Sequence, residues 1–245
     1  MGKPVVLITG GLAGIGRAAA IAFAKKGAKL VVGVGAMRPV AKELRSFGSE
    51  AEFINADVRK ENEVRALVDK TVARFGRLDV AVNNAGTEGE VGPITDLTAE
   101  SYAATFDTNI LGVILRMKHE VRVMLGQVGG GIINISSTYG HKGAAGASLY
   151  AGSKHAVEGI TKSVALEVAK SGIRVNAFAP GPTDTGMLTR FTGTAENKAA
   201  LATQVPLGRL GRSEEVADGI VFIGSEEARF VTGHVLNVDG GHSAN

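Results

Sequence analysis

Three side chains in the middle of the chain have the types and the spacing needed to move a proton to or from a carbonyl oxygen. Tyr150 and Lys154 are four residues apart, so on a helix they share one face and the ammonium group can lie beside the phenol. A nearby cation lowers the pKa of a phenol from its usual value of about 10. Tyr150 could then act as a general acid in ketone reduction or a general base in alcohol oxidation. Ser137, at the end of an expected strand, could hold the substrate oxygen against this tyrosine.

A glycine-rich turn near the start of the chain indicates a nucleotide. The residues are Thr9-Gly10-Gly11-Leu12-Ala13-Gly14-Ile15-Gly16, between an expected strand and an expected helix. Gly10 permits a tight turn, Gly14 lets the backbone approach a pyrophosphate, and Gly16 permits close packing of helix and sheet. The alternative is a plain strand-to-helix turn, because a lone glycine pattern is a weak signal. A Tyr–Lys pair four residues apart also arises easily by chance, so both motifs depend on their structural context.

That context is an alternation of strands and helices along the whole chain. The expected strands are Val5–Thr9, Leu30–Val34, Glu52–Asn55, Val80–Asn83, Ile132–Ser136, Arg174–Ala177 and Val235–Val238. The expected helices are Gly14–Lys26, Val40–Phe47, Glu61–Phe75, Ser101–Met124, Ala151–Lys170 and several between Thr185 and Gly224. The longest expected loops are Thr87–Thr95 and Gly186–Gly211.

Apolar strands without polar alternation are typical of a parallel sheet that is covered on both faces. We therefore predict the α/β class, with a single-domain Rossmann fold in which helices flank a doubly wound, seven-stranded parallel sheet. The domain spans residues 1–245, with a cofactor half at about 1–130 and a catalytic and substrate half at about 131–245.

Composition excludes several other classes of protein. Glycine is abundant, with 34 residues, but 44% apolar residues and only 6 prolines exclude a disordered or collagen-like chain. The sequence has no cysteine, which excludes thiolate metal sites and cysteine nucleophiles and favours the cytoplasm. The five histidines lack metal-ligand spacing, so we expect no metal and read them as ordinary surface or core residues. The net charge of +3 comes from scattered residues, so we expect no nucleic-acid binding. The sequence has no long apolar run, so we expect no membrane binding.

The spacing GxxxGxG and the later motifs resemble the short-chain dehydrogenase/reductase family along essentially the whole chain. The resemblance implies a catalytic tetrad of Asn109, Ser137, Tyr150 and Lys154. In the family, the serine positions the substrate oxygen, the tyrosine exchanges the proton, and the lysine lowers the pKa of the tyrosine and grips the ribose. The asparagine kinks a long helix and holds a water connected to the lysine. The resemblance also implies a homotetramer, formed through the long helices and the C-terminal segment.

The same resemblance assigns the cofactor contacts. Asp57-Val58 would hold the adenine, Asn83-Asn84-Ala85-Gly86 would meet the adenine-side ribose, and Pro180-Gly181 would shape the nicotinamide pocket. The full predicted set is Gly10, Leu12, Gly14, Ile15, Gly16, Gly35, Arg38, Asp57, Val58, Asn83, Ala85, Gly86, Tyr150, Lys154, Pro180, Gly181, Thr183 and Thr185.

The end of the second strand bears on the choice between NAD and NADP. An NAD enzyme would place an Asp there to bind the ribose 2′-hydroxyl, but this chain has Val34, which permits a 2′-phosphate. The arginine usual in NADP enzymes is replaced by Gly35 and Ala36, and only Arg38 is near enough to reach the phosphate. NADP(H) is therefore slightly favoured, and NAD(H) is possible.

Substrate contacts are expected from Thr138–Leu149, Glu88–Pro93 and a mobile segment, Gly186–Gln204. Their apolar members, Tyr139, Met187, Leu188 and Phe191, favour a neutral, moderately hydrophobic ketone or secondary alcohol. The closest family resemblance is to carbonyl reductases, glucose 1-dehydrogenase-like enzymes and 3-oxoacyl-carrier-protein reductases. Two alternatives remain: a dinucleotide-sensing protein that has lost catalysis, and epimerisation or dehydration on the same tetrad.

Overall fold

The computed structural model describes residues 2–34, 39–127 and 129–244. Its centre is a seven-stranded parallel sheet with the strand order β3-β2-β1-β4-β5-β6-β7. The strands are β1 (Val5–Thr9), β2 (Lys29–Val34), β3 (Ala51–Asn55), β4 (Val80–Asn83), β5 (Gly130–Ile135), β6 (Ile173–Pro180) and β7 (Val235–Val238). The predicted Rossmann-like α/β fold is confirmed.

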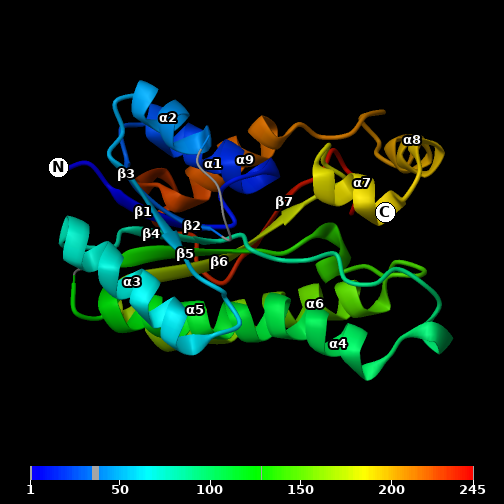
Figure 1. Ribbon diagram of the computed structural model, residues 1–245, viewed down its shortest axis with the longest axis horizontal. Helices are drawn as coiled ribbons and strands as arrows, with labels where there is room; N and C mark the ends of the chain where they lie inside the picture. Colours follow the sequence, from blue (N-terminus) through cyan, green and yellow to red (C-terminus); the bar gives the residue numbers. More distant parts are fainter. Residues whose placement is uncertain (1, 35–38, 128, 245) are drawn as a thin grey trace.

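Helices cover both faces of this sheet (Figure 1). One layer contains α1 (Gly14–Lys25), α2 (Pro39–Ser46) and α9 (Ser213–Gly224). The other contains α3 (Glu61–Phe75), α4 (Ala99–Phe106), α5 (Gly112–Met124) and α6 (Ser148–Val168). Buried valine, leucine and isoleucine side chains on both faces of the strands pack against these layers, which explains the unbroken apolar runs.

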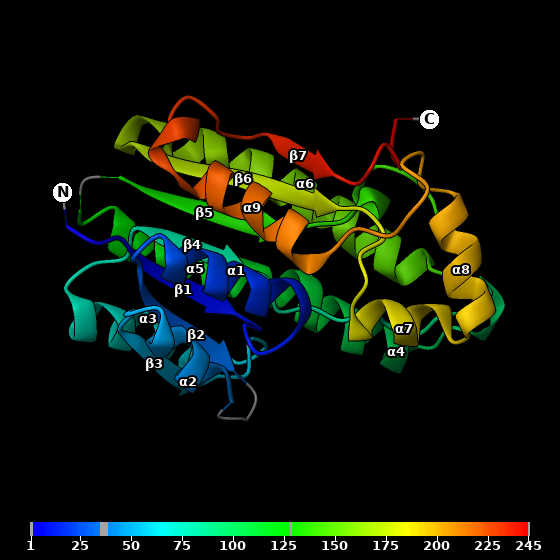
Figure 2. The same ribbon diagram turned by 90° about the horizontal axis from the view of Figure 1, so that it is seen from above.

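The segment expected to be a long loop after β6 contains two short helices, α7 (Gly186–Thr192) and α8 (Ala195–Thr203). Each begins at a threonine whose side chain caps the helix: Thr185 accepts from the backbone N–H of Leu188, and Thr194 from that of Asn197. Both helices lie beyond the carboxyl ends of the strands, where the C-terminus also lies (Figure 2). Residues 186–203 are therefore mostly helical, as predicted for the region between Thr185 and Gly224, and do not form a long loop.

The long helix expected at 101–124 starts two residues earlier, at Ala99, and changes its winding in the middle. Residues Asp107–Leu111 form a π-helical turn between α4 and α5. The turn contains the buried Asn109. Local π-helical turns bend a helix and redirect its side chains, as the resemblance implied for this asparagine.

A layer of buried polar side chains lies between α5 and the centre of the sheet. Asn83 Nδ2 donates to Glu120 Oε2 (2.9 Å) and to Asn134 Oδ1 (2.9 Å). Burial raises the pKa of Glu120 to about 7, although Asn83 and the nearby Arg116 both act to lower it. Among the described residues, no group donates a hydrogen bond to Glu120 Oε1. The folded protein therefore holds this carboxyl in its neutral form well above the pH at which an unfolded chain ionises it.

Glu120 should make the folded state less stable as the pH rises. Between pH 5 and pH 8 the unfolded chain has lost the Glu120 proton, whereas the native state loses it only near pH 7, so the free energy of unfolding falls. Glu120→Gln removes this dependence, and we expect its stability relative to the wild type to rise between these pH values by roughly 2 kcal/mol. Urea unfolding at both pH values measures the difference. Glu167→Gln, at an exposed position, is the matched control. An equal change in relative stability with pH in both variants would show that Glu120 is not the source of the pH dependence.

Candidate active site

The glycine turn between β1 and α1 is closed by side chains from β4. Asn84 Nδ2 donates to the backbone oxygens of Thr9 (3.0 Å) and Gly10 (3.1 Å). Gly10 has a φ of +67°, and a Cβ there would lie 2.9 Å from Asn84 Nδ2. A Cβ on Gly16 would lie 2.4 Å from the Gly10 oxygen. The tight turn therefore requires glycine at both positions, as the motif predicts.

The N-terminal end of α1 has the properties of an anion site. Its N-cap is Ala13, whose side chain makes no cap hydrogen bond, and the first turn carries no acidic residue. Leu12 and Ile15 pack against the core beside the turn. A Cβ on Gly14 would meet only Thr185, at 3.3 Å, at the start of α7. Free backbone N–H groups at a helix N-terminus favour negative charge, so these residues fit a pyrophosphate.

A fully buried arginine holds the floor of this turn and was not predicted from the sequence. Arg116 on α5 donates from Nη1 to Thr9 Oγ1 (2.5 Å) and from Nη2 to the oxygen of Ala85 (3.3 Å). Thr9 Oγ1 also accepts the backbone N–H of Ala85 (3.2 Å), so β1 and β4 are tied together at their carboxyl ends. Burial lowers the pKa of Arg116 to about 10, which leaves it charged at neutral pH. The only sequence signal is a basic residue within an apolar stretch.

The predicted adenine contacts stand at the end of β3. The Asp57 carboxylate accepts from the backbone N–H and the guanidinium of Arg59, and this pairing lowers the pKa of Asp57 to about 2. Val58 is buried and packs against Val64, Leu115 and Ala85. The predicted residues Gly35, Ala36 and Arg38 lie outside the described residues.

The residues after β4 point in different directions. The Asn83 side chain belongs to the buried polar layer, so only its backbone faces the turn. Gly86 lies against the centre of the site, because a Cβ there would be 3.1 Å from Asn109 Oδ1 and 3.7 Å from Lys154 Nζ. Asn109 Oδ1 accepts the backbone N–H of Thr87 (2.9 Å), while its Nδ2 donates to the Thr87 oxygen (2.9 Å) and to Ser153 Oγ (3.0 Å). The bent helix thus fixes the segment that follows β4.

The remaining three members of the predicted tetrad come from β5 and α6. Ser137 follows the end of β5, and its Oγ accepts the backbone N–H of Tyr139 (3.2 Å). Tyr150 and Lys154 lie on one face of α6, with Lys154 Nζ 5.6 Å from the centroid of the Tyr150 ring. Lys154 Nζ donates to the backbone oxygen of Ile135 (2.8 Å). All four predicted catalytic residues are therefore close to the carboxyl edge of the sheet.

The protonation of this pair differs from the expectation that Lys154 lowers the pKa of Tyr150. Burial raises the pKa of Tyr150 to about 12, a hydrogen bond with Ser137 acts to lower it, and the charge of Glu88 adds to the increase. Burial and the charge of Arg116 lower the pKa of Lys154 to about 8. The ammonium group donates to the Ile135 carbonyl, and desolvation is the largest cause of the pKa shift of both groups. At neutral pH the phenol is protonated and the lysine is mostly charged.

The segment after β6 borders the other side of the site. A Cβ on Gly181 would lie 2.6 Å from Asp239 Cα, so the chain crosses the C-terminal segment closely directly after Pro180. Thr183 Oγ1 donates to the Gly181 oxygen (2.9 Å), and Thr185 caps α7. These four predicted residues lie opposite the glycine turn, since Thr185 approaches Gly14.

Two aromatic rings stand beside Tyr150 on its exposed side. Their centroids are 6.5 Å (Tyr139) and 6.1 Å (Phe191) from that of Tyr150, and 6.1 Å from each other. Tyr139 follows β5 and Phe191 belongs to α7, as the sequence predicts for substrate contacts. An apolar body could pack against this wall with its carbonyl oxygen near Tyr150.

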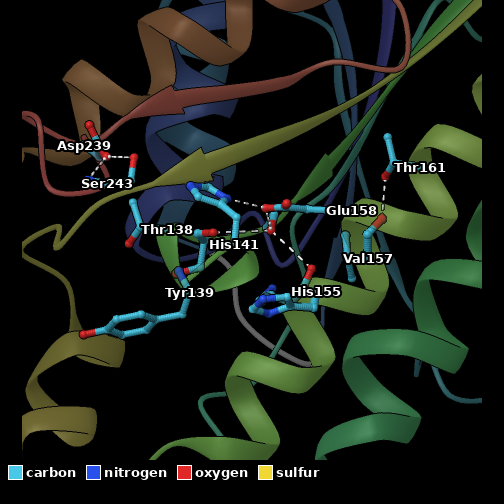
Figure 3. A network of polar contacts seen from close by, with 12 residues as sticks. Thr138, Tyr139, His141, His155, Val157, Glu158, Thr161, Asp239 and Ser243 are labelled. Carbon is cyan, nitrogen blue, oxygen red and sulfur yellow. Dashed lines mark hydrogen bonds and ion pairs between the residues drawn. The ribbon is translucent and has the colours of Figure 1, made fainter. Parts of the chain in front are cut away.

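A second polar network lies behind the catalytic segment, and its histidines were read as ordinary residues. The buried Glu158 on α6 accepts from Ser136 Oγ (2.9 Å), and its Oε1 lies 3.0 Å from His141 Nδ1. In Figure 3 these contacts lie on the far side of the segment from the Tyr139 ring, which points away from them. His242 lies 3.1 Å from Thr138 Oγ1. These histidines therefore anchor residues 138–141.

In the residues that the structure describes, no cluster of three or more His, Asp or Glu side chains is arranged to hold a metal ion. Across the same ranges, no helix is both long enough and apolar enough to cross a membrane.

Comparison with known proteins places the chain among dehydrogenases and reductases. The family model described as enoyl-(acyl carrier protein) reductase matches residues 10–243. Cis-4-hydroxycyclohexanecarboxylate dehydrogenase from Sinomonas cyclohexanicum is 41% identical over 242 residues, covering 98% of this chain and 96% of the relative. Cyclohexanol dehydrogenase from Acinetobacter sp. (strain SE19) is 37% identical over 243 residues, covering 98% and 95%.

A solved structure agrees with these relatives. The structure of a variant of actinorhodin polyketide ketoreductase with NADPH has a TM-score of 0.94 and 35% identity, with 99% of this chain and 98% of the other covered. The chain therefore belongs to the short-chain dehydrogenase/reductase family and is an oxidoreductase.

Proposed function

We propose that this enzyme interconverts a neutral ketone and the corresponding secondary alcohol with a nicotinamide dinucleotide, with Tyr150 as the general acid and base. The observation that carries the proposal is the meeting of Ser137, Tyr150 and Lys154 at the sheet edge that also holds the open glycine turn. The names of two relatives, a cyclohexanol dehydrogenase and a hydroxycyclohexanecarboxylate dehydrogenase, support a secondary alcohol as the substrate class, and the first of them supports a neutral one.

The residues that would hold the dinucleotide follow from the fit of the turn. The N–H groups at the start of α1 would face the pyrophosphate, with Gly10, Gly14 and Gly16 giving the backbone room. Asp57, the backbone beyond Asn83 and the Pro180–Thr185 segment would line the rest of the site. When bound, the nicotinamide supplies or accepts the hydride. We propose that this cofactor half covers about residues 1–130 and the catalytic half about 131–245.

The protein supplies the proton and positions the oxygen. A Tyr150 phenol with a pKa of about 12 is protonated at neutral pH, so it can donate to the oxygen of a ketone as negative charge develops there. The Ser137 hydroxyl would donate a second hydrogen bond to the same oxygen. Lys154, charged below a pKa of about 8, would stabilise the phenolate that the proton transfer leaves behind. Asn109 would act as a positioning residue, because it fixes the backbone of Thr87 beside Gly86.

The proton transfer predicts a specific loss in Tyr150→Phe. We expect kcat for ketone reduction to fall by about a hundredfold or more, because a positioned general acid contributes about 10²–10⁴ in rate. The Kd of the dinucleotide should change little. Tyr102→Phe makes the same chemical change on an exposed ring of α4 and should keep wild-type activity. Undiminished reduction by purified Tyr150→Phe would show that another group moves the proton.

We propose NADP(H) as the preferred cofactor. The absence of an acidic residue at Val34 supports it, and the related ketoreductase structure holds NADPH. The kcat/KM ratio with NADPH and NADH should therefore favour NADPH. In Val34→Asp a carboxylate would repel the 2′-phosphate, so the ratio should fall by about tenfold or more, whereas the uncharged Val34→Asn should change it less. A strong preference of the wild type for NADH would contradict the proposal.

We also propose a homotetramer. Apolar side chains are exposed on α4, on α6 and near β7, among them Tyr102, Leu166 and Phe230. Such exposed apolar side chains suit interfaces between subunits. Light scattering after size-exclusion chromatography should give four times the chain mass, and an active monomer would contradict this. The cytoplasmic location remains a prediction from the sequence.

A further inference from the structure

One ion pair joins the segment after β4 to α7 beside the candidate active site. Arg190 on α7 contacts Glu88, which follows β4 and is 102 positions away in the sequence, through Nε and through Nη2 (3.2 Å to Oε2). Phe191, the next residue on α7, lies beside Tyr150 and Tyr139. The pair therefore lies next to the aromatic wall against which a substrate would pack.

The two charges of this pair are not equally exposed. The Glu88 side chain is 13% exposed and the Arg190 side chain 64%, so the carboxylate faces the interior and the guanidinium faces solvent. Glu88 is close enough to the catalytic phenol for its charge to act on Tyr150. A substrate bound at Tyr150 therefore faces the negative partner of the pair, while the positive partner lies on the solvent side.

The position of Glu88 is well determined. Its neighbour Thr87 is held at both its N–H and its carbonyl by the buried Asn109. The Thr87 hydroxyl also accepts the backbone N–H of Gly89 (3.2 Å). The Glu88 carboxylate is therefore kept beside the site, because Thr87 and Gly89 on either side of it are held by hydrogen bonds.

We propose that Glu88, held by Arg190, determines the charge selectivity of the substrate site: it admits neutral ketones and rejects oxo acids whose carboxylate lies next to the reacting carbonyl. Two carboxylates in a partly desolvated site repel each other, whereas an ester or amide at the same position carries no charge. This inference rests on the proposed function and names its substrate class more closely. Glu88 neither donates nor accepts the transferred proton, and its charge acts on the substrate as it does on Tyr150.

Methyl benzoylformate and benzoylformate test the proposal, because they share the reacting ketone and the ring, and one carries a charge beside the carbonyl while the other does not. The wild type should favour the ester in kcat/KM. Glu88→Gln keeps the shape of the side chain and an oxygen that can accept from Arg190, so we expect the ester-to-acid ratio of kcat/KM to fall by about tenfold. Arg190→Gln leaves the carboxylate uncompensated and should raise the ratio. The double variant Glu88→Gln/Arg190→Gln should give the same ratio as Glu88→Gln. This result would show that the ratio depends on the charge at position 88 and not on the ion pair itself.

Lys198→Gln is the matched control, because it removes the ion pair between Lys198 on α8 and Asp184, which precedes α7. It should leave the ratio at the wild-type value. An unchanged ratio in Glu88→Gln, an equal loss on both probes, or a wild-type preference for the acid would overturn the proposal.

A binding measurement separates this proposal from the proposed function. The Kd of benzoylformate for the enzyme loaded with oxidised dinucleotide, from calorimetry, should be about tenfold lower in Glu88→Gln than in the wild type. If neither probe is turned over but the Kd shifts, the charge selectivity holds and the reaction is different. If the Kd is the same in both proteins, Glu88 does not select for charge.

Discussion

Parallel strands end on the same side of a sheet, and the active site depends on this constraint. The residues after β1, β3, β4, β5 and β6 all emerge at one edge, although they are spread over more than half of the sequence. For that reason this edge brings together the glycine turn, Asn84, Ser137 and Pro180. Arg116 and Asn84 add the local ties that hold the ends of β1 and β4 together. The helices then complete the site: α6 brings Tyr150 and Lys154, and α7 brings Phe191.

Burial, more than ion pairing, determines the pKa values of the charged groups around this edge. It raises the pKa of Tyr150 and lowers those of Lys154 and Arg116, and in each case desolvation is the largest cause. A phenol that keeps its proton is suited to donate one, and a lysine with a lowered pKa still carries charge at neutral pH. Glu88 adds a negative charge beside the same site, where Arg190 partly compensates it. Reaction and selectivity therefore both depend on how far water is excluded from this edge.

Local patterns explain why much of the fold and the site could be predicted. Three patterns each depend on neighbours within a few residues or on one crossover: the apolar runs, the glycine spacing, and the spacing of Ser137, Tyr150 and Lys154. Contacts between distant segments could not be predicted from such local patterns. The Glu88–Arg190 pair joins positions 102 apart, and Arg116 reaches Thr9 across 107 positions. The pKa of Tyr150 was predicted in the wrong direction, since helical spacing shows which groups are neighbours but not how deeply they are buried.

The central claim is that this edge joins dinucleotide and carbonyl in one reaction centre. The most direct test is a single-turnover reduction of methyl benzoylformate with NADPH carrying deuterium at the transferable C4 position, followed by mass spectrometry of the product. The account predicts one deuterium at the carbinol carbon for each dinucleotide oxidised. A product without deuterium, or tight binding of the dinucleotide with no transfer to this or any other ketone, would contradict it.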